Sequence, residues 1–154
     1  MARGNGPADP IKIAFPYGQG VETMWANPLE DGTYEVDNSP FEVYGISYRD
    51  VIAARPEEGR LVFDRVVRHG GHSTYRIKLN AGAGHDLFLK YWPELALLGC
   101  TFEGTGTDPR RLYAIDVPQI SVVPRVYAYL EKLEENGVWE FEEAHYFRPQ
   151  VQSG

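Results

Sequence analysis

The stretch from Val66 to Leu79 constrains the fold more than any other part of the chain, because it alternates on both sides of a glycine pair. Alternating polar and apolar side chains have the two-residue period of a β-strand. The pair Gly70-Gly71 allows the backbone to bend sharply between the two runs. We therefore expect a strand on each side of the bend and a change of architecture across it.

The residues before the bend form several short alternating runs, separated by turns rich in Gly, Pro and Asp. Among these turns, Asp31-Gly32 has the composition of a hairpin. Closely spaced short strands of this kind favour a small barrel or a curled sheet. The expected strands cover residues 11–15, 21–26, 33–36, 41–46, the end of 48–54, and 60–67.

The residues after the bend contain two segments with helical patterns among segments with the two-residue period of strands. A helical composition over 86–98 ends at Gly99, and Pro93 marks either a kink in this helix or its first turn. A second helix should run from Pro124 to about Glu135 with an apolar stripe on one face.

The resulting order is strand, helix, strand, strand, helix, strand, which is the ferredoxin-like arrangement. The predicted fold class is thus α+β, with a small β-barrel-like lobe over 11–68 followed by a ferredoxin-like βαββαβ sandwich over 69–147. Loose tails are expected at 1–10 and 148–154.

Composition narrows the functional classes. The 154 residues are 43% hydrophobic and 24% charged, as in ordinary globular proteins, with no apolar run long enough to span a membrane. A net charge of −7 argues against nucleic-acid binding. The single cysteine, Cys100, excludes an internal disulfide, favours a cytoplasmic location and is expected to be an inert core thiol.

The glycine bend is the first candidate site. Gly70 and Gly71 would let the backbone approach a ligand, with Thr74 beside them, while His72 and Ser73 are candidates for a base and a nucleophile. Alternation places His72 and Ser73 on opposite faces of the strand, which makes a catalytic pair geometrically poor. The alternative is a structural bend whose hydroxyls bond backbone groups.

Glu22, Trp25 and Asp50 form the second candidate site. Glu22 close to a large aromatic ring would be an acid with a raised pKa if both lay in a pocket. The alternative places Trp25 in the core and Glu22 in solvent. Asp50 would be a carboxylate aimed at the same place, or a turn residue that bonds its own backbone.

No metal site or cofactor is predicted. The four histidines, His69, His72, His85 and His145, show no spacing typical of metal ligands, and Cys100 has no partner cysteine.

Near the C-terminus, two aromatic residues alternate with acidic ones. Trp139 and Phe141 would be anchors for a protein or peptide partner, surrounded by Glu140, Glu142 and Glu143. The acidic charge indicates a basic partner. The alternative is an exposed strand with a solvated acidic face.

Four motifs together resemble a known family. They are Val21–Ala26, Asp37–Phe41, Gly71–Thr74 and Leu98–Cys100, and with them the chain resembles domain of unknown function 4265 from about Ile11 to Tyr146. The resemblance implies a bacterial source, in a family whose members are small proteins encoded near toxin or biosynthetic genes. It carries no activity, and it implies that position 72 varies, which argues against catalysis by His72.

Two functions are compatible with these features. The first is a non-catalytic binding protein, such as an immunity-type inhibitor or accessory protein, that recognises a protein or peptide through the acidic segment. The second is a small enzyme or small-molecule binder with its site between the two lobes near the Gly-Gly-His-Ser-Thr bend.

Overall fold

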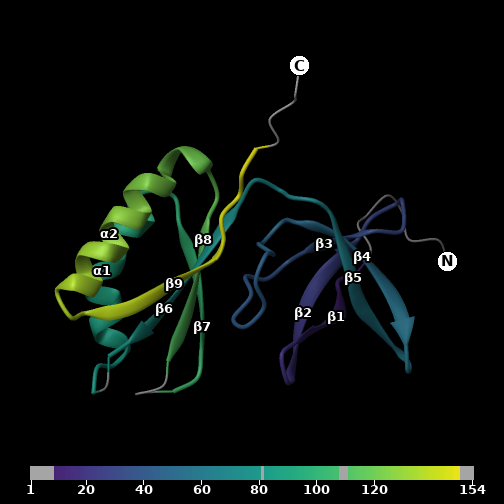
Figure 1. Cartoon of the computed structure of the whole chain (residues 1–154), viewed down its shortest axis with the longest axis horizontal. Helices are drawn as coiled ribbons and strands as arrows, with labels where there is room; N and C mark the ends of the chain where they lie inside the picture. Colours follow the sequence, from purple (N-terminus) through teal and green to yellow (C-terminus); the bar gives the residue numbers. More distant parts are fainter. Residues whose placement is uncertain (1–8, 81, 108–110, 150–154) are drawn as a thin grey trace.

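The computed structural model describes residues 9–80, 82–107 and 111–149, so the predicted tails lie mostly outside the described residues. The chain has an α+β fold in which a five-stranded ring is followed by a four-stranded antiparallel sheet with two helices (Figure 1). Within the described part, neither helix is long and apolar enough to cross a membrane.

The first lobe is the ring. Its strands are β1 (Ile11–Tyr17), β2 (Gly20–Pro28), β3 (Tyr34–Val36), β4 (Val51–Glu57) and β5 (Arg60–Arg68). Sequential neighbours pair antiparallel, and β1 closes the ring by pairing in parallel with β5. Side chains such as Ile13, Phe15 and Met24 alternate into its interior and form a core of their own. The predicted turn at Asp31-Gly32 is present, with Asp31 accepting a hydrogen bond from the amide of Thr33.

The second lobe has the predicted order of elements. They are β6 (Ser73–Leu79), α1 (His85–Leu97), β7 (Thr101–Thr105), β8 (Leu112–Val117), a 3-10 turn η1 (Ile120–Val122), α2 (Val123–Glu135) and β9 (Trp139–His145). The strands lie in the order β7-β8-β6-β9. Helix α1 continues through Pro93, so this residue neither starts nor ends it.

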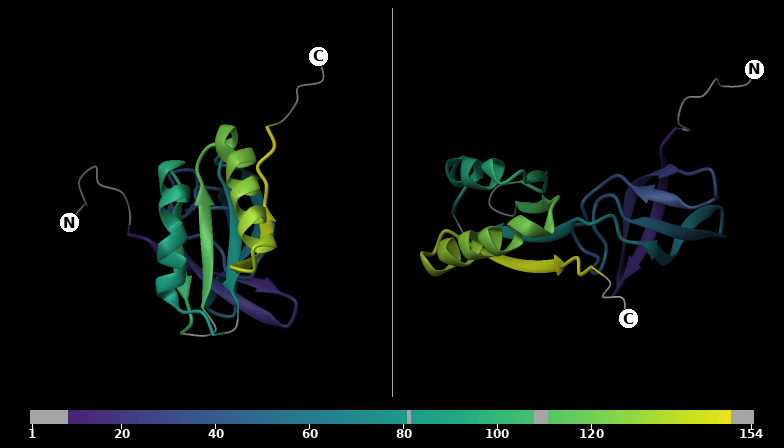
Figure 2. Two further views of the ribbon diagram at one scale, coloured as in Figure 1. Left: turned by 90° about the vertical axis from the view of Figure 1, so that its left-hand side faces the viewer. Right: turned by 90° about the horizontal axis from the view of Figure 1, so that it is seen from above.

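Both helices cover one face of this sheet, and its other face is turned toward the ring (Figures 1 and 2). From β6, Tyr75 and Ile77 are buried on the helix side in the same core as the predicted stripe of α2, which comprises Val126, Leu130 and Leu133. The alternate residues of β6 therefore face the first lobe. This arrangement places polar side chains of one lobe against loops of the other.

The prediction of a strand over 41–46 is wrong. Residues 37–50, which we call the junction loop, form no strand and cross from the ring to the open face of the second sheet. The apolar pattern arose because Val43 and Ile46 are buried against the core of the ring. The amides of residues 41–43 and the carbonyl of Val43 bond side chains instead of a neighbouring strand, and the amide of Gly45 donates to the carbonyl of Ala144.

Candidate functional site between the two lobes

Glu22 holds the first part of the junction loop. Its carboxylate accepts hydrogen bonds from the amides of Phe41, Glu42 and Val43, at 2.6, 3.0 and 3.1 Å. Such bonds replace the backbone pairing that this segment lacks. Glu22 is therefore a loop-stabilising residue, and the predicted role of an acid in an aromatic pocket has no support from its contacts.

Arg76 holds the same loop from the second lobe. Its side chain is 2% exposed and bonds the carboxylate of Glu142 at 2.7 Å. Its guanidinium also donates to the carbonyl oxygens of Val43 and Pro40, at 2.8 and 3.3 Å, and lies over the ring of Tyr44. A buried guanidinium with several acceptors fixes the position of the loop on the sheet.

Glu142 connects this arginine to the loop a second time, because it also accepts a hydrogen bond from the Tyr44 hydroxyl at 2.6 Å. Partial burial opposes ionisation of this carboxyl group, but the hydrogen bonds from Tyr44 and Arg76 outweigh it and lower the pKa of Glu142.

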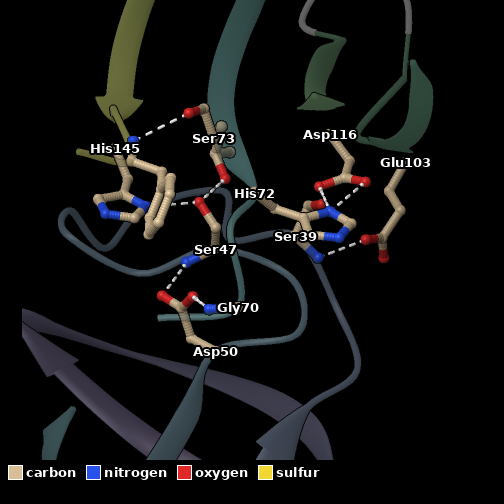
Figure 3. A network of polar contacts seen from close by, with 11 residues as sticks. Ser39, Ser47, Asp50, Gly70, His72, Ser73, Glu103, Asp116 and His145 are labelled. Atoms are coloured by element: carbon tan, nitrogen blue, oxygen red, sulfur yellow. Dashed lines mark hydrogen bonds and ion pairs between the residues drawn. The ribbon is translucent and has the colours of Figure 1, made fainter. Parts of the chain in front are cut away.

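Asp50 lies at the centre of the junction and is fully buried. Its carboxylate accepts hydrogen bonds of 2.9 Å from the amides of Ser47 and Gly70. Both bonds are drawn in Figure 3. A third contact, at 2.9 Å, joins Oδ2 to Nδ1 of His69, whose side chain is 36% exposed. A carboxylate without access to water requires such partners.

The contact with Asp50 determines the tautomer of His69. Since an ionised carboxylate only accepts hydrogen bonds, Nδ1 of His69 must carry the proton. Nε2 then presents a lone pair, and it has no hydrogen-bond partner among the described residues. This pair is the arrangement in which a carboxylate orients an imidazole for proton exchange.

Ser47 and His145 extend the cluster into the second lobe. The Ser47 hydroxyl lies 2.6 Å from the Thr74 hydroxyl. It also lies 2.7 Å from Nδ1 of His145, its neighbour in Figure 3. The His145 ring stacks on His69 with centroids 4.5 Å apart. Burial lowers the pKa of His145, Asp50 opposes this effect and His69 adds to it, so the ring tends to remain neutral. Ser47 itself has no exposed surface and is not an accessible nucleophile.

His72 and Ser73 have separate partners. Nδ1 of His72 lies 2.8 and 2.9 Å from the two carboxylate oxygens of Asp116, a contact drawn in Figure 3. The Ser73 hydroxyl accepts a hydrogen bond from the amide of Phe147. The expectation that they do not form a catalytic pair agrees with these contacts. Of the predicted bend residues, Gly70 and Thr74 belong to the cluster around Asp50, the first through its amide and the second through its hydroxyl. Gly71 takes a φ of 92°, a conformation that glycine adopts at low cost.

The structure does not bring Trp25 to this cluster. Its ring is 43% exposed and lies under the Lys12 ammonium, which is 5.1 Å from the ring centre. Its amide and carbonyl bond Asn38 and Asp37, so its backbone helps to position the start of the junction loop.

The predicted aromatic anchors face inward. Trp139 is fully buried, and its indole donates to the carbonyl of Leu130. Phe141 packs against Tyr75 and Tyr127, and Glu143 accepts a hydrogen bond from the Tyr75 hydroxyl. Alternation put both aromatic rings on the helix side of the sheet. Trp139 therefore cannot act as an exposed anchor. Of the three glutamates, Glu140 alone makes no side-chain hydrogen bond or ion pair with the described residues.

A hollow of about 450 Å³ opens next to His69. It lies between the end of β5 and the chain that follows β9, and its lining residues are Val66, Val67, Arg68, His69, Phe147 and Arg148. Ligand sites commonly have such volumes and a few convergent polar groups. A second hollow, of about 310 Å³, lies on the open sheet face at Arg76, Lys78 and Glu142, where the arginine and glutamate already bond each other.

The central residues of this cluster carry little recognisable signal in the sequence. His69 belonged to the bend motif, but Ser47 is 98 positions from its partner His145. No metal site was expected from the histidine spacing, yet the fold brings donor atoms of Asp50, His69 and His145 within 4.8 Å of one another. Only the pairing of the two lobes reveals this group.

Comparisons with known proteins agree with the resemblance. The chain belongs to the family described as Domain of unknown function (DUF4265), whose model matches residues 22–141. A comparison with curated proteins finds no match. The chain is similar to a solved structure described as a hypothetical protein from Neisseria gonorrhoeae, with 18% identity and a TM-score of 0.72. The match covers 90% of this chain and 96% of the other, and it shows a shared fold.

Proposed function

We propose that this DUF4265 protein binds a small anionic molecule in the hollow between its two lobes, and that the Asp50–His69 pair exchanges a proton with it. The observation that carries the proposal is the buried carboxylate behind a partly exposed imidazole that lines this hollow. We assign the lobes to a small β-barrel and a ferredoxin-like sandwich, and the strand order β7-β8-β6-β9 supports the second assignment.

Charge supports an anionic ligand. Arg68 and Arg148 line the hollow together with His69, and none of the described residues that line it carries a carboxylate. Guanidinium groups recognise carboxylates and phosphates through paired hydrogen bonds. The overall charge of −7 would repel the same ligand elsewhere on the surface.

The chemistry follows from the position of Nε2. A ligand group that loses a proton to Nε2 would create an imidazolium, and the Asp50 carboxylate would stabilise its positive charge. Ser47 and Ser73 are both buried, so a serine nucleophile at this site is not part of the proposal. General acid–base chemistry on a bound anion fits the exposed groups better than covalent catalysis.

The test is a titration of the ¹⁵N-labelled protein with acetate, citrate and inorganic phosphate, with acetamide as a neutral match for acetate. We expect the anions to shift the resonances of Val67, Arg68, His69 and Phe147, and acetamide to shift none. Arg68→Ala should weaken binding about tenfold, the loss of one charged contact. Arg65→Ala on the same strand is the control, because Arg65 is exposed and bonds Asp64.

Shifts confined to the other hollow, at Lys78 and Glu140, would contradict the proposal. Equal affinities of Arg68→Ala and Arg65→Ala would contradict it as well, since binding would then depend on overall charge alone.

A further inference from the structure

We propose that Asp50, His69 and His145 form a binding site for one divalent transition-metal ion, with Zn²⁺ as the simplest occupant. Each residue offers one donor atom, and these atoms lie within 4.8 Å of one another. Two imidazoles and one carboxylate are a donor set that binds zinc, copper or nickel in preference to magnesium or calcium.

The Asp50–His69 contact is already close to the spacing that such a site needs. Ligand atoms about 2.0–2.1 Å from a tetrahedral Zn²⁺ lie roughly 3.3 Å apart. Nδ1 of His69 and Oδ2 of Asp50 are 2.9 Å apart. The ion would thus take the place of the proton that these two atoms share.

His145 supplies the third donor from the second lobe. Its ring stacks on His69 at 4.5 Å with an angle of 26° between the planes, and its Nδ1 bonds the hydroxyl of Ser47. The amide of Ser47 donates to Oδ2 of Asp50. Nδ1 of His145 and Nδ1 of His69 therefore contact two side chains of the same turn of the junction loop, those of Ser47 and Asp50. Donor atoms as far as 4.8 Å apart must approach to roughly 3.3 Å, and the stacked ring of His69 must turn so that its lone pair lies toward the ion. The 36% exposure of the His69 side chain leaves its ring room to do so.

The surroundings also favour coordination. The backbone amides of Ser47 and Gly70 hold the Asp50 carboxylate in place, which fixes the anionic ligand of the site. The site joins residues of the junction loop, the end of β5 and the end of β9. A bound ion would therefore tie the two lobes together and should raise the stability of the folded chain.

The inference extends the proposed function without depending on it. An ion on Nδ1 forces the proton of His69 to Nε2, because a neutral imidazole carries one proton. Nε2 of His69 would then donate a hydrogen bond to an anion in the hollow, whereas without the ion it would accept a proton from the anion. Metal binding and anion binding are measured separately, so failure of either proposal is distinguishable from failure of the other.

The experiment is calorimetric titration of the untagged, chelator-treated protein with ZnCl₂, repeated with CoCl₂ and MgCl₂. We expect one Zn²⁺ per chain, visible absorption bands of a tetrahedral Co²⁺ complex, and no saturable binding of Mg²⁺. His69→Gln and His145→Gln should each weaken Zn²⁺ binding at least tenfold. His85→Gln is the matched control, because His85 bonds Tyr113 at the start of α1 and lies outside the donor set.

Circular dichroism of each variant shows that it is folded, and ¹⁵N NMR provides a readout specific to the site. Zn²⁺ should move the proton of His69 from Nδ1 to Nε2 in the wild type. The proposal is overturned by the absence of stoichiometric Zn²⁺ binding, by equal Zn²⁺ affinity in His69→Gln and the wild type, or by an equal loss in His85→Gln.

Discussion

Oδ2 of the buried Asp50 lies 2.9 Å from Nδ1 of the partly exposed His69. The two residues are 19 positions apart in the sequence and flank the open end of the β4–β5 hairpin, since Asp50 precedes β4 and His69 follows β5. The amide of Gly70 bonds the other carboxylate oxygen at 2.9 Å. Asp50 thereby links the junction loop to the bend between the lobes. Its contacts serve the fold and orient His69 at the same time.

Replacement of Arg76 by Met should destabilise the protein strongly. The side chain is 2% exposed and bonds Glu142 and two loop carbonyls, which would lose their donor. Because the Glu142 side chain is 47% exposed, water can take over part of its bond to Arg76. The main cost is the loss of the donor to the buried carbonyls of Val43 and Pro40, about 1–3 kcal/mol. Urea unfolding measures this difference. Lys78→Met, at an exposed position on the same face of β6, should change stability by less than about 0.5 kcal/mol; equal effects would show that Arg76 does not hold the loop.

Gly70→Ala should disturb the bend through lack of space. An added Cβ would lie 2.5 Å from the carbonyl oxygen of Arg49, a backbone atom that cannot rotate away. Overpacking of this kind costs about 1–3 kcal/mol. Thermal unfolding should show the loss, and NMR should show changed His69 resonances because the Gly70 amide binds Asp50. Gly82→Ala is the control. An added Cβ at Gly82 would meet no atom within 4 Å, but the φ of 86° disfavours a side chain, so this variant measures backbone strain without overpacking.

Acid should weaken the attachment of the junction loop through Glu142. Its pKa in the folded protein lies below the ordinary value of 4.5, so the unfolded chain takes up a proton first as the pH falls. Its contribution is complete above about pH 4.5 and disappears as the pH falls through the folded pKa. The free energy of unfolding of Glu142→Gln should therefore fall less between pH 6 and pH 3 than that of the wild type. Glu140→Gln should retain the wild-type slope.

Cys100 should resist alkylation in the folded protein. Burial raises the pKa of its thiol to about 12, and the negative charge of Asp116 adds to this effect. The thiolate, which is the reactive form, is then scarce at pH 8. Iodoacetamide should label the chain in 6 M guanidinium and leave the native protein unlabelled for hours; rapid native labelling would place Cys100 at an accessible surface.

Periodicity predicted the elements of this fold better than it predicted the site. The stripe of Val126, Leu130 and Leu133 faces the core as expected, because a helix face and a buried stripe are both local properties. The segment 41–46 misled the prediction, since Val43 and Ile46 are buried although their loop forms no strand.

The site depends on contacts between residues far apart in the sequence. Ser47 reaches His145 over 98 positions and Thr74 over 27, and no local pattern marks such pairs. Asp50 was predicted either as a carboxylate beside Glu22 and Trp25 or as a turn residue, and its contact with His69 follows only from the pairing of β4 with β5. Alternation places Trp139 and Phe141 of the acidic segment on the helix side, where Trp139 is fully buried and Phe141 is partly buried. Trp139 is therefore not an exposed anchor, and partner binding by the acidic segment stays a prediction.

The tautomer of His69 in the metal-free protein tests the central claim most directly. Long-range ¹H–¹⁵N correlation spectra at pH 7.5 distinguish a proton on Nδ1 from one on Nε2. The account predicts Nδ1–H with an unprotonated Nε2 in the wild type, and a shift toward the Nε2–H form in Asp50→Asn. A wild-type His69 that is mainly Nε2–H, with no change in Asp50→Asn, would contradict it.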